Sequence, residues 1–161
     1  MKLLVALFAL ALLISCRSKP QRQEASAESR SETSGPTLAQ QKLCAEQAKK
    51  AFDEYRQGGK LGGDEPMLDY TSHFDPQKNL CYVRINSTTM GKSGETISAI
   101  VYDAFERRVF ASYAWVSYSG KKYWEVKPSE CEVHPQQQPT VYCQSIEEFN
   151  DLVEKWFGVA Q

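Results

Sequence analysis

Apolar residues recur at helical spacing in two stretches of the chain, and the first covers residues 38–58. Its apolar face carries Cys44, Ala48, Ala51, Phe52 and Tyr55. Thr37 and Gln40 precede it at the spacing of a capping box, in which two side chains satisfy the free backbone N–H groups of a helix start. Gly58-Gly59 then favours an end, because glycine accepts the left-handed conformation that closes many helices. The pattern predicts a helix that opens a folded domain.

Apolar and polar residues alternate, as they do in strands, in the middle of the domain. In residues 80–85, Cys81, Val83 and Ile85 share one face. Further strands are predicted over residues 97–102, 109–118 and 123–126. Glu106-Arg107 and Ser119-Gly120 supply turns between them, so an antiparallel meander is the simplest topology.

The second helical stretch closes the chain. Ser145 and Glu148 again fit a capping box, and Gly158 follows the last apolar residue. The apolar positions are Phe149, Leu152, Val153, Trp156 and Phe157. The order helix, strands, helix predicts an α+β domain over residues 38–161, an antiparallel sheet of about four strands with an N-terminal and a C-terminal helix packed on it. A small barrel with appended helices is the alternative.

The first fifteen residues show the three zones of a secretory signal peptide. Lys2 is positively charged, residues 3–14 are uninterruptedly apolar, and Ser15 is small. An apolar helix of this length spans about 18 Å, against a hydrocarbon core of about 30 Å, so it is too short to cross a membrane stably. We expect residues 1–15 to be removed as a signal peptide.

Leu13-Ile14-Ser15-Cys16 resembles the lipobox of bacterial lipoproteins. The resemblance implies that Cys16 becomes the first residue of the mature chain and carries a diacylglycerol on its sulfur and an acyl chain, such as palmitate, on its amino group. In Gram-negative lipoproteins an Asp after the cysteine favours the inner membrane, so Arg17 implies the outer membrane, facing the periplasm. The alternatives are a Gram-positive host, which has no outer membrane, and ordinary secretion with Cys16 inside the signal.

Residues 16–37 join this lipid-anchor cysteine to the domain. Residues 17–37 contain no Val, Ile, Leu or aromatic residue and carry four positive and three negative charges. Such a composition cannot build a core. We expect a disordered tether with an average span of about 25 Å.

The charge of the domain argues against nucleic acid as a partner. From residue 38 onward, fourteen Lys and Arg oppose seventeen Asp and Glu, a net charge of −3, and no basic block is longer than a pair. Nucleic-acid-binding domains normally carry a basic patch. The predicted partners are the membrane, through the N-terminal lipid, and an unidentified protein.

Four cysteines remain beside Cys16, and exported chains normally pair their thiols. They are Cys44, Cys81, Cys131 and Cys143, for which three pairings exist. Cys44 lies on the inner face of the first helix and Cys81 on the apolar face of the first predicted strand, so these two can meet, which leaves Cys131 with Cys143. Because the chain contains no Cys-x-x-Cys motif, we predict structural disulfides rather than a redox site.

Three segments resemble an uncharacterised family of exported bacterial proteins. They are Tyr70-Thr71-Ser72-His73-Phe74-Asp75, Tyr102-Asp103-Ala104-Phe105-Glu106 and Ala111-Ser112-Tyr113, together with the spacing of Cys131 and Cys143. The likeness covers about residues 40–157. It implies a compact, exported, disulfide-linked module, and it implies no reaction.

His73 and Asp75 are the main candidates for chemistry. A His-x-Asp pair on one strand face could bind a metal or transfer protons, as in a hydrolase. Two ligands do not complete a metal site, and the other histidine, His134, lies in a distant Pro-flanked loop. We expect His73 and Asp75 instead to hydrogen-bond the turn that follows them. No metal, cofactor or enzymatic activity is predicted.

Aromatic residues are densest between residues 110 and 124. Both faces of residues 109–118 are apolar, so this strand is either covered on both sides or exposes one face to a partner. Cover is favoured, because the two helices need a surface on which to pack. In the other case the recognition surface consists of Tyr113, Trp115, Tyr118, Tyr123 and Trp124.

These features together predict a lipid-anchored protein of the cell envelope that acts as a non-enzymatic binding or structural module. The alternative is an inhibitor or chaperone of an envelope or host enzyme. A hydrolase that uses His73 and Asp75 is the least favoured hypothesis.

Overall fold

The structure is a computed structural model that describes residues 35–58, 66–91, 94–117, 121–122 and 124–159. All of these belong to one compact unit, Ser34–Gln161. The predicted signal peptide, Cys16 and residues 17–34 of the tether lie outside the described residues, as do Tyr118 and Tyr123. The hypotheses about these positions stay predictions.

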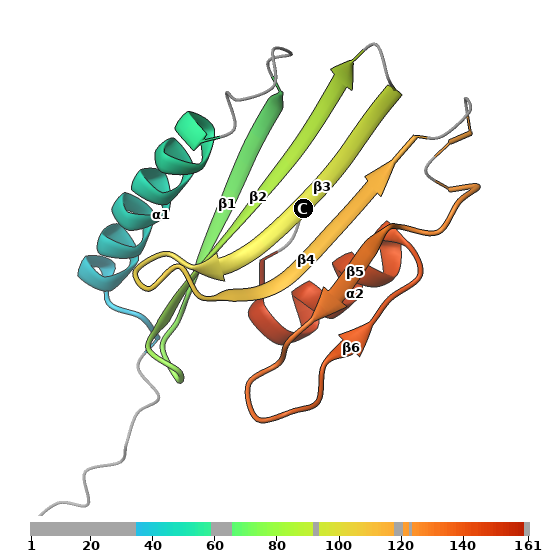
Figure 1. Cartoon of the computed structure of the whole chain (residues 1–161). Coiled ribbons are helices and arrows are strands. Elements are labelled where there is room, and N and C mark those ends of the chain that lie inside the picture. Colours follow the sequence, from blue (N-terminus) through green and yellow to red (C-terminus); the bar gives the residue numbers. More distant parts are fainter. Residues whose placement is uncertain (1–34, 59–65, 92–93, 118–120, 123, 160–161) are drawn as a thin grey trace, which may run out of the picture. The chain divides into compact units, whose positions relative to one another are not determined.

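Six strands form one antiparallel sheet, in which strands that follow one another along the chain are neighbours (Figure 1). The strands are β1 (Met67–Asp75), β2 (Leu80–Gly91), β3 (Gly94–Asp103), β4 (Val109–Val116), β5 (Glu130–Val133) and β6 (Val141–Tyr142). The α+β class and the meander topology are therefore confirmed. The number of strands is a correction, since about four were predicted.

Three of the predicted strands lie in β2, β3 and β4, but the fourth was wrong. Residues 124–126 form a turn and a bend rather than a strand. The N–H of Glu125 donates to the carbonyl of Lys122 at 2.9 Å, and the Glu125 carboxylate accepts from the N–H of Lys122 at 2.7 Å. These local bonds occupy backbone groups that a strand would have paired with a neighbouring strand.

The two helices, α1 (Leu38–Gly58) and α2 (Ile146–Phe157), lie on opposite faces of the sheet. Strand β2 shows the division, because successive side chains of a strand point to opposite faces. Cys81, Val83 and Ile85 join the core cluster beneath α1, whereas Tyr82 joins the cluster beneath α2. In Figure 1, α2 lies behind β4 and β5. The sheet therefore has two separate cores, one on each side.

Both helices begin with the capping boxes that the sequence predicts. At the start of α1, Thr37 Oγ1 accepts from the N–H of Gln40 at 3.2 Å, and Gln40 Oε1 accepts from the N–H of Thr37 at 2.9 Å. At the start of α2, Ser145 Oγ accepts from the N–H of Glu148 at 3.2 Å, whereas the Glu148 carboxylate accepts from the N–H of Gln144 at 2.8 Å in place of that of Ser145, so this box is only half formed. Gly158, with a φ of 65°, closes α2 as predicted.

Both predicted disulfide pairings are confirmed. Cys44 and Cys81 join α1 to β2 across a Cα–Cα distance of 5.4 Å. Cys131 and Cys143 close the loop between β5 and β6 across 5.1 Å. The first bridge fastens α1 to the sheet, and the second fastens the two shortest strands to each other just before α2 begins.

A β-bulge in β4 turns one side chain toward the α1 side. Tyr102 pairs with Val109, but Val101 pairs with Ala111, so Phe110 is the extra residue. Phe110 and Ala111 both join the cluster beneath α2. Val109 is left 43% exposed, next to α1.

Candidate functional site

One side of the sheet is covered only in part. Helix α1 packs on β1 and β2 and reaches Tyr102 and Ile100 of β3, and no described helix covers the same side of β4 to β6. Directly opposed residues of antiparallel strands share a face. Two cross-strand rows therefore lie on this side, Ile100–Ser112–Glu132–Tyr142 and Ala114–Glu130. We call these residues the open face.

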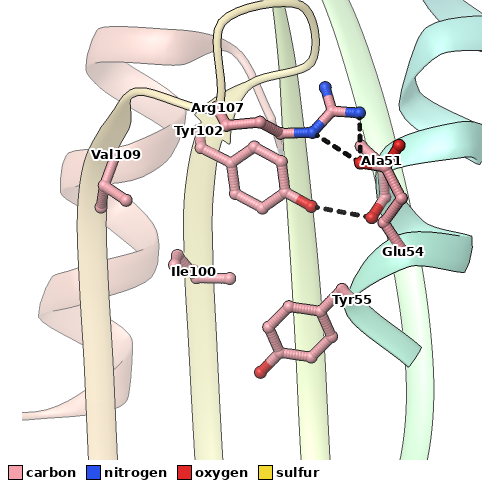
Figure 2. Close-up of a pocket in the computed structure, with 7 residues that line it drawn as sticks. All are labelled: Ala51, Glu54, Tyr55, Ile100, Tyr102, Arg107 and Val109. Carbon is pink, nitrogen blue, oxygen red and sulfur yellow. Dashed lines mark hydrogen bonds and ion pairs between the residues drawn. The ribbon is translucent and has the colours of Figure 1, made fainter. Parts of the chain in front are cut away.

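A groove of about 250 Å³ runs along the border between α1 and the open face (Figure 2). Its lining residues are Ala51, Glu54 and Tyr55 of α1, Ile100 and Tyr102 of β3, Arg107 of the following turn, and Val109 of β4. Most of the lining surface is apolar. The β-bulge places Val109 there, and the groove continues onto the open face through Ile100.

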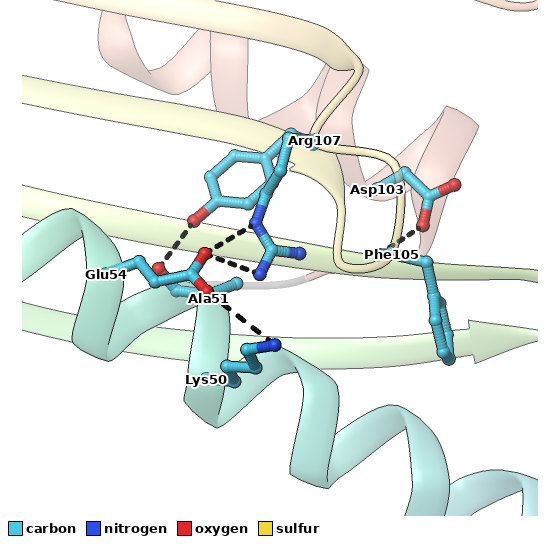
Figure 3. A network of polar contacts seen from close by, with 7 residues as sticks. Lys50, Ala51, Glu54, Asp103, Phe105 and Arg107 are labelled. Carbon is cyan, nitrogen blue, oxygen red and sulfur yellow. Dashed lines mark hydrogen bonds and ion pairs between the residues drawn. The ribbon is translucent and has the colours of Figure 1, made fainter.

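An ion pair and a hydrogen bond hold the two walls of this groove together (Figure 3). Arg107 donates to Glu54 Oε2 from Nη2 at 2.7 Å and from Nε at 3.1 Å. The Tyr102 hydroxyl donates to the carbonyl oxygen of Ala51 at 3.3 Å. The turn is itself braced, because Asp103 Oδ1 accepts from the N–H of Phe105 at 2.9 Å. These contacts set the distance between α1 and the β3–β4 turn.

Burial keeps the Tyr102 hydroxyl protonated. Desolvation raises the pKa of Tyr102 to about 12, and the nearby Arg107 charge opposes that rise only in part. The phenol therefore remains a hydrogen-bond donor far above neutral pH.

Tyr102→Phe tests this contact through its pH dependence. The unfolded phenol ionises near its ordinary pKa of about 10, whereas the folded phenol holds its proton to about 12. Between these values the folded state binds more protons, so the free energy of unfolding falls as pH rises. We expect Tyr102→Phe to cost about 1 kcal/mol at pH 7 and to weaken this alkaline fall. Urea unfolding at pH 7, 9, 10 and 11 measures both effects.

Tyr142→Phe is the matched control for that experiment, because its side chain is 69% exposed. The variant also removes one hydroxyl from the same side of the sheet. An equally steep alkaline fall in native protein and Tyr102→Phe would show that the Tyr102 phenol is not buried as described.

The five aromatic residues of the predicted recognition surface do not share one surface in the structure. Tyr113 is 2% and Trp115 is 1% exposed, and both belong to the core cluster beneath α2. They are therefore core residues rather than surface residues, since the apolar side of α2 packs on them. Trp124 is 67% exposed. Tyr118 and Tyr123 lie outside the described residues. Of the part of β4 that is described, the side toward α2 is covered as predicted, whereas Ser112 and Ala114 on the other side belong to the open face.

Asp75 serves the turn after β1, as predicted. Its Oδ1 accepts from the N–H groups of Gln77 at 2.9 Å and Lys78 at 3.1 Å, and its Oδ2 pairs with Lys78 Nζ at 2.9 Å. Burial alone would raise the pKa of Asp75, but the bonds from Lys78 and Gln77 outweigh burial and hold this pKa below its usual value. His73 lies beside Gly158, where an added Cβ would come within 3.1 Å of its Nε2. The predicted turn role is therefore confirmed for Asp75, whereas His73 makes no hydrogen bond to this turn among the described residues.

The side chains of Glu132, His134 and Thr140 form a chain of polar contacts that was not predicted. Glu132 Oε1 lies 3.3 Å from His134 Nε2, and His134 Nδ1 lies 3.0 Å from Thr140 Oγ1. These contacts cross the loop that the Cys131–Cys143 disulfide closes. They stabilise this loop beside the open face. The sequence from Pro135 to Thr140 has no periodic pattern from which these contacts could be predicted.

Arg84 is a buried charge on the opposite side of the sheet. It is 1% exposed, and it donates from Nε to Asn86 Oδ1 at 2.8 Å and from Nη2 to Asn150 Oδ1 at 2.7 Å. Asn86 in turn donates to Asp69 Oδ1 at 2.6 Å. Burial lowers the pKa of Arg84, although a guanidinium stays charged at neutral pH. The network fixes α2 on β2.

A second hollow, of about 280 Å³, lies near the start of α1. It is lined by Gln40, Leu43, Phe74, Asn79, Leu80, Asp103, Phe105 and Glu106. Its most buried polar group, the Asp103 carboxylate, already caps the β3–β4 turn. That buried carboxylate is therefore engaged within the fold.

Within the described residues, no cluster of three or more His, Cys, Asp or Glu side chains could hold a metal ion. Among the helices described, none is long and apolar enough to cross a membrane. Comparison with protein families, with curated proteins and with solved structures finds no match for this chain.

Proposed function

We propose that this chain is a lipid-anchored protein of a bacterial cell envelope and that its folded domain is a non-enzymatic binding module. The observation that carries the binding role is the open face with its adjoining groove, where none of the described helices covers this side of β4 to β6. The proposed location is the outer membrane, with the domain in the periplasm.

The sequence before the domain supports the anchor. Leu13-Ile14-Ser15-Cys16 supplies the lipobox, and the polar residues after it supply a tether. Each buried methylene of an acyl chain contributes about 0.8 kcal/mol to membrane binding, and the sum for one chain gives only marginal, reversible binding. An anchor of three chains is effectively permanent. The tether keeps the domain about 25 Å from the lipid.

The two disulfides support an oxidising compartment. Cys44–Cys81 and Cys131–Cys143 use all four cysteines of the domain, and cytosolic thiols are normally kept reduced. Cys16 is then the one cysteine without a thiol partner in the domain. This fits a residue whose sulfur is reserved for lipid.

The anchor is tested by growing cells that express the full chain with an alkyne fatty-acid analogue. The native chain should incorporate the label and sediment with membranes, whereas Cys16→Ser should lose the label and remain folded with both disulfides formed. Ser18→Ala, two residues beyond the cysteine, is the matched control and should stay labelled. An unlabelled native chain, or equal labelling of Cys16→Ser, would refute the anchor.

A further inference from the structure

We propose that the open face binds an extended peptide that carries an apolar side chain followed by Lys or Arg. The apolar side chain enters the groove, and the cationic side chains lie over Glu130 and Glu132. This inference rests on the proposed binding function and names the chemistry of the partner.

The apolar anchor follows from the groove. Its floor and walls are made by Ile100, Val109 and Tyr55. Glu54 and Arg107 are paired at 2.7 Å, although Nη1 of Arg107 has no hydrogen-bond partner among the described residues. A polar side chain that does not accept from Nη1 of Arg107 would lose its hydration there for few new hydrogen bonds. An aromatic or branched aliphatic side chain gains by covering the apolar lining.

The extended shape follows from the middle of the open face. Ser112 and Ala114 stand between the groove and Glu132, and such small side chains let another backbone lie close to the sheet. Strands are spaced by about 4.8 Å, so the row from Ile100 to Tyr142 is about 14 Å long. Four or five residues of extended chain, at about 3.3 Å each, cover that distance.

The positive charge follows from the carboxylates at the far end of the rows. Glu130 is exposed and makes no ion pair with any described Lys or Arg. Among the described residues, the ion-pair partner of Glu132 is His134, at 3.3 Å. Arg107, the cation at the groove, is held by Glu54. Within the described part of the chain, no Lys or Arg neutralises the carboxylates at this end, which favours a cationic partner and disfavours an anionic one.

Selection from a random hexapeptide library displayed on beads tests this proposal, with the detergent-solubilised full chain as bait. We expect enriched peptides to contain an aromatic or aliphatic residue and at least two Lys or Arg. The Glu130→Gln/Glu132→Gln double variant should bind these peptides about tenfold more weakly at low salt, and raised NaCl should weaken native binding similarly. Val109→Gln should also weaken binding, through the groove.

Glu46→Gln is the matched control, since Glu46 is an exposed residue of α1 whose ion-pair partner among the described residues is Lys42, at 3.9 Å. It should bind as the native chain does. Thermal unfolding of each variant separates lost binding from lost folding. No enrichment, enrichment without cationic residues, or equal binding by the double variant would overturn the proposal. So would self-association of the chain that Val109→Gln abolishes, because a second copy would then occupy the groove.

The two proposals can fail independently. If selection fails while Cys16 carries lipid, the envelope assignment stands and the peptide site is wrong. If selection succeeds while Cys16 carries none, the peptide site stands and the anchor is wrong.

Discussion

Replacing Trp115 by alanine is expected to lower the free energy of unfolding by about 3–5 kcal/mol. Trp115 is 1% exposed and lies in the core cluster beneath α2, so the substitution removes a large buried ring and leaves a cavity. Urea unfolding followed by far-ultraviolet circular dichroism measures the loss without depending on tryptophan fluorescence.

Trp124→Ala is the matched control, because it removes the same side chain from a position that is 67% exposed. Its effect should stay within about 0.5 kcal/mol, as for most surface substitutions. Equal losses in the two variants would show that Trp115 is not part of the core. That result would reopen the hypothesis of an aromatic recognition surface on β4.

Removing the Cys44–Cys81 disulfide, by Cys44→Ala with Cys81→Ala, should cost about 4 kcal/mol. The bridge closes a loop with a sequence separation of 37, and it restricts the unfolded chain more than a short loop does. It also fastens α1, which forms one wall of the groove. Chemical denaturation of the double variant and of the native protein gives the difference.

The second disulfide provides the comparison. Cys131 and Cys143 are separated by only 12 positions, so Cys131→Ala with Cys143→Ala should cost about 3 kcal/mol. The order of the two losses is the informative part. A larger loss from the short loop would mean that strain or local packing, rather than loop entropy, determines what these bridges contribute.

The sequence predicts those parts of the fold in which local pattern and tertiary packing agree. The two helices have capping boxes and one apolar face each. Segment 80–85 alternates as a half-buried strand does. The Cys44–Cys81 pair follows from where these elements place it, and the Cys131–Cys143 pair then follows by elimination. In each of these helices and strands, the pattern that predicts the element lies within the element itself.

The missed strands depend on their neighbours. β1 carries exposed polar residues such as Asp69, Ser72 and His73, and it becomes a strand because it pairs with β2 along its whole length. β5 and β6 span only four and two residues, too few for a periodic signal. The wrong strand prediction at residues 123–126 arose because β-forming residues were counted without the local turn at Glu125.

The groove could not be predicted because it joins residues far apart in the chain. Arg107 and Glu54 meet across 53 positions, and Val109 faces them only because of the bulge at Phe110. Glu106-Arg107 was visible as a turn between strands. To predict the contact of that turn with α1, one would have to know that α1 and α2 lie on opposite faces of the sheet.

The intact mass of the full chain, purified from membranes in detergent, tests the proposed assignment most directly. We expect a mature chain that begins at Cys16 and carries the added mass of a diacylglycerol and an amide-linked acyl chain. A chain that begins at any other residue, or an unmodified Cys16, would contradict the assignment of this protein as a lipid-anchored module of the cell envelope.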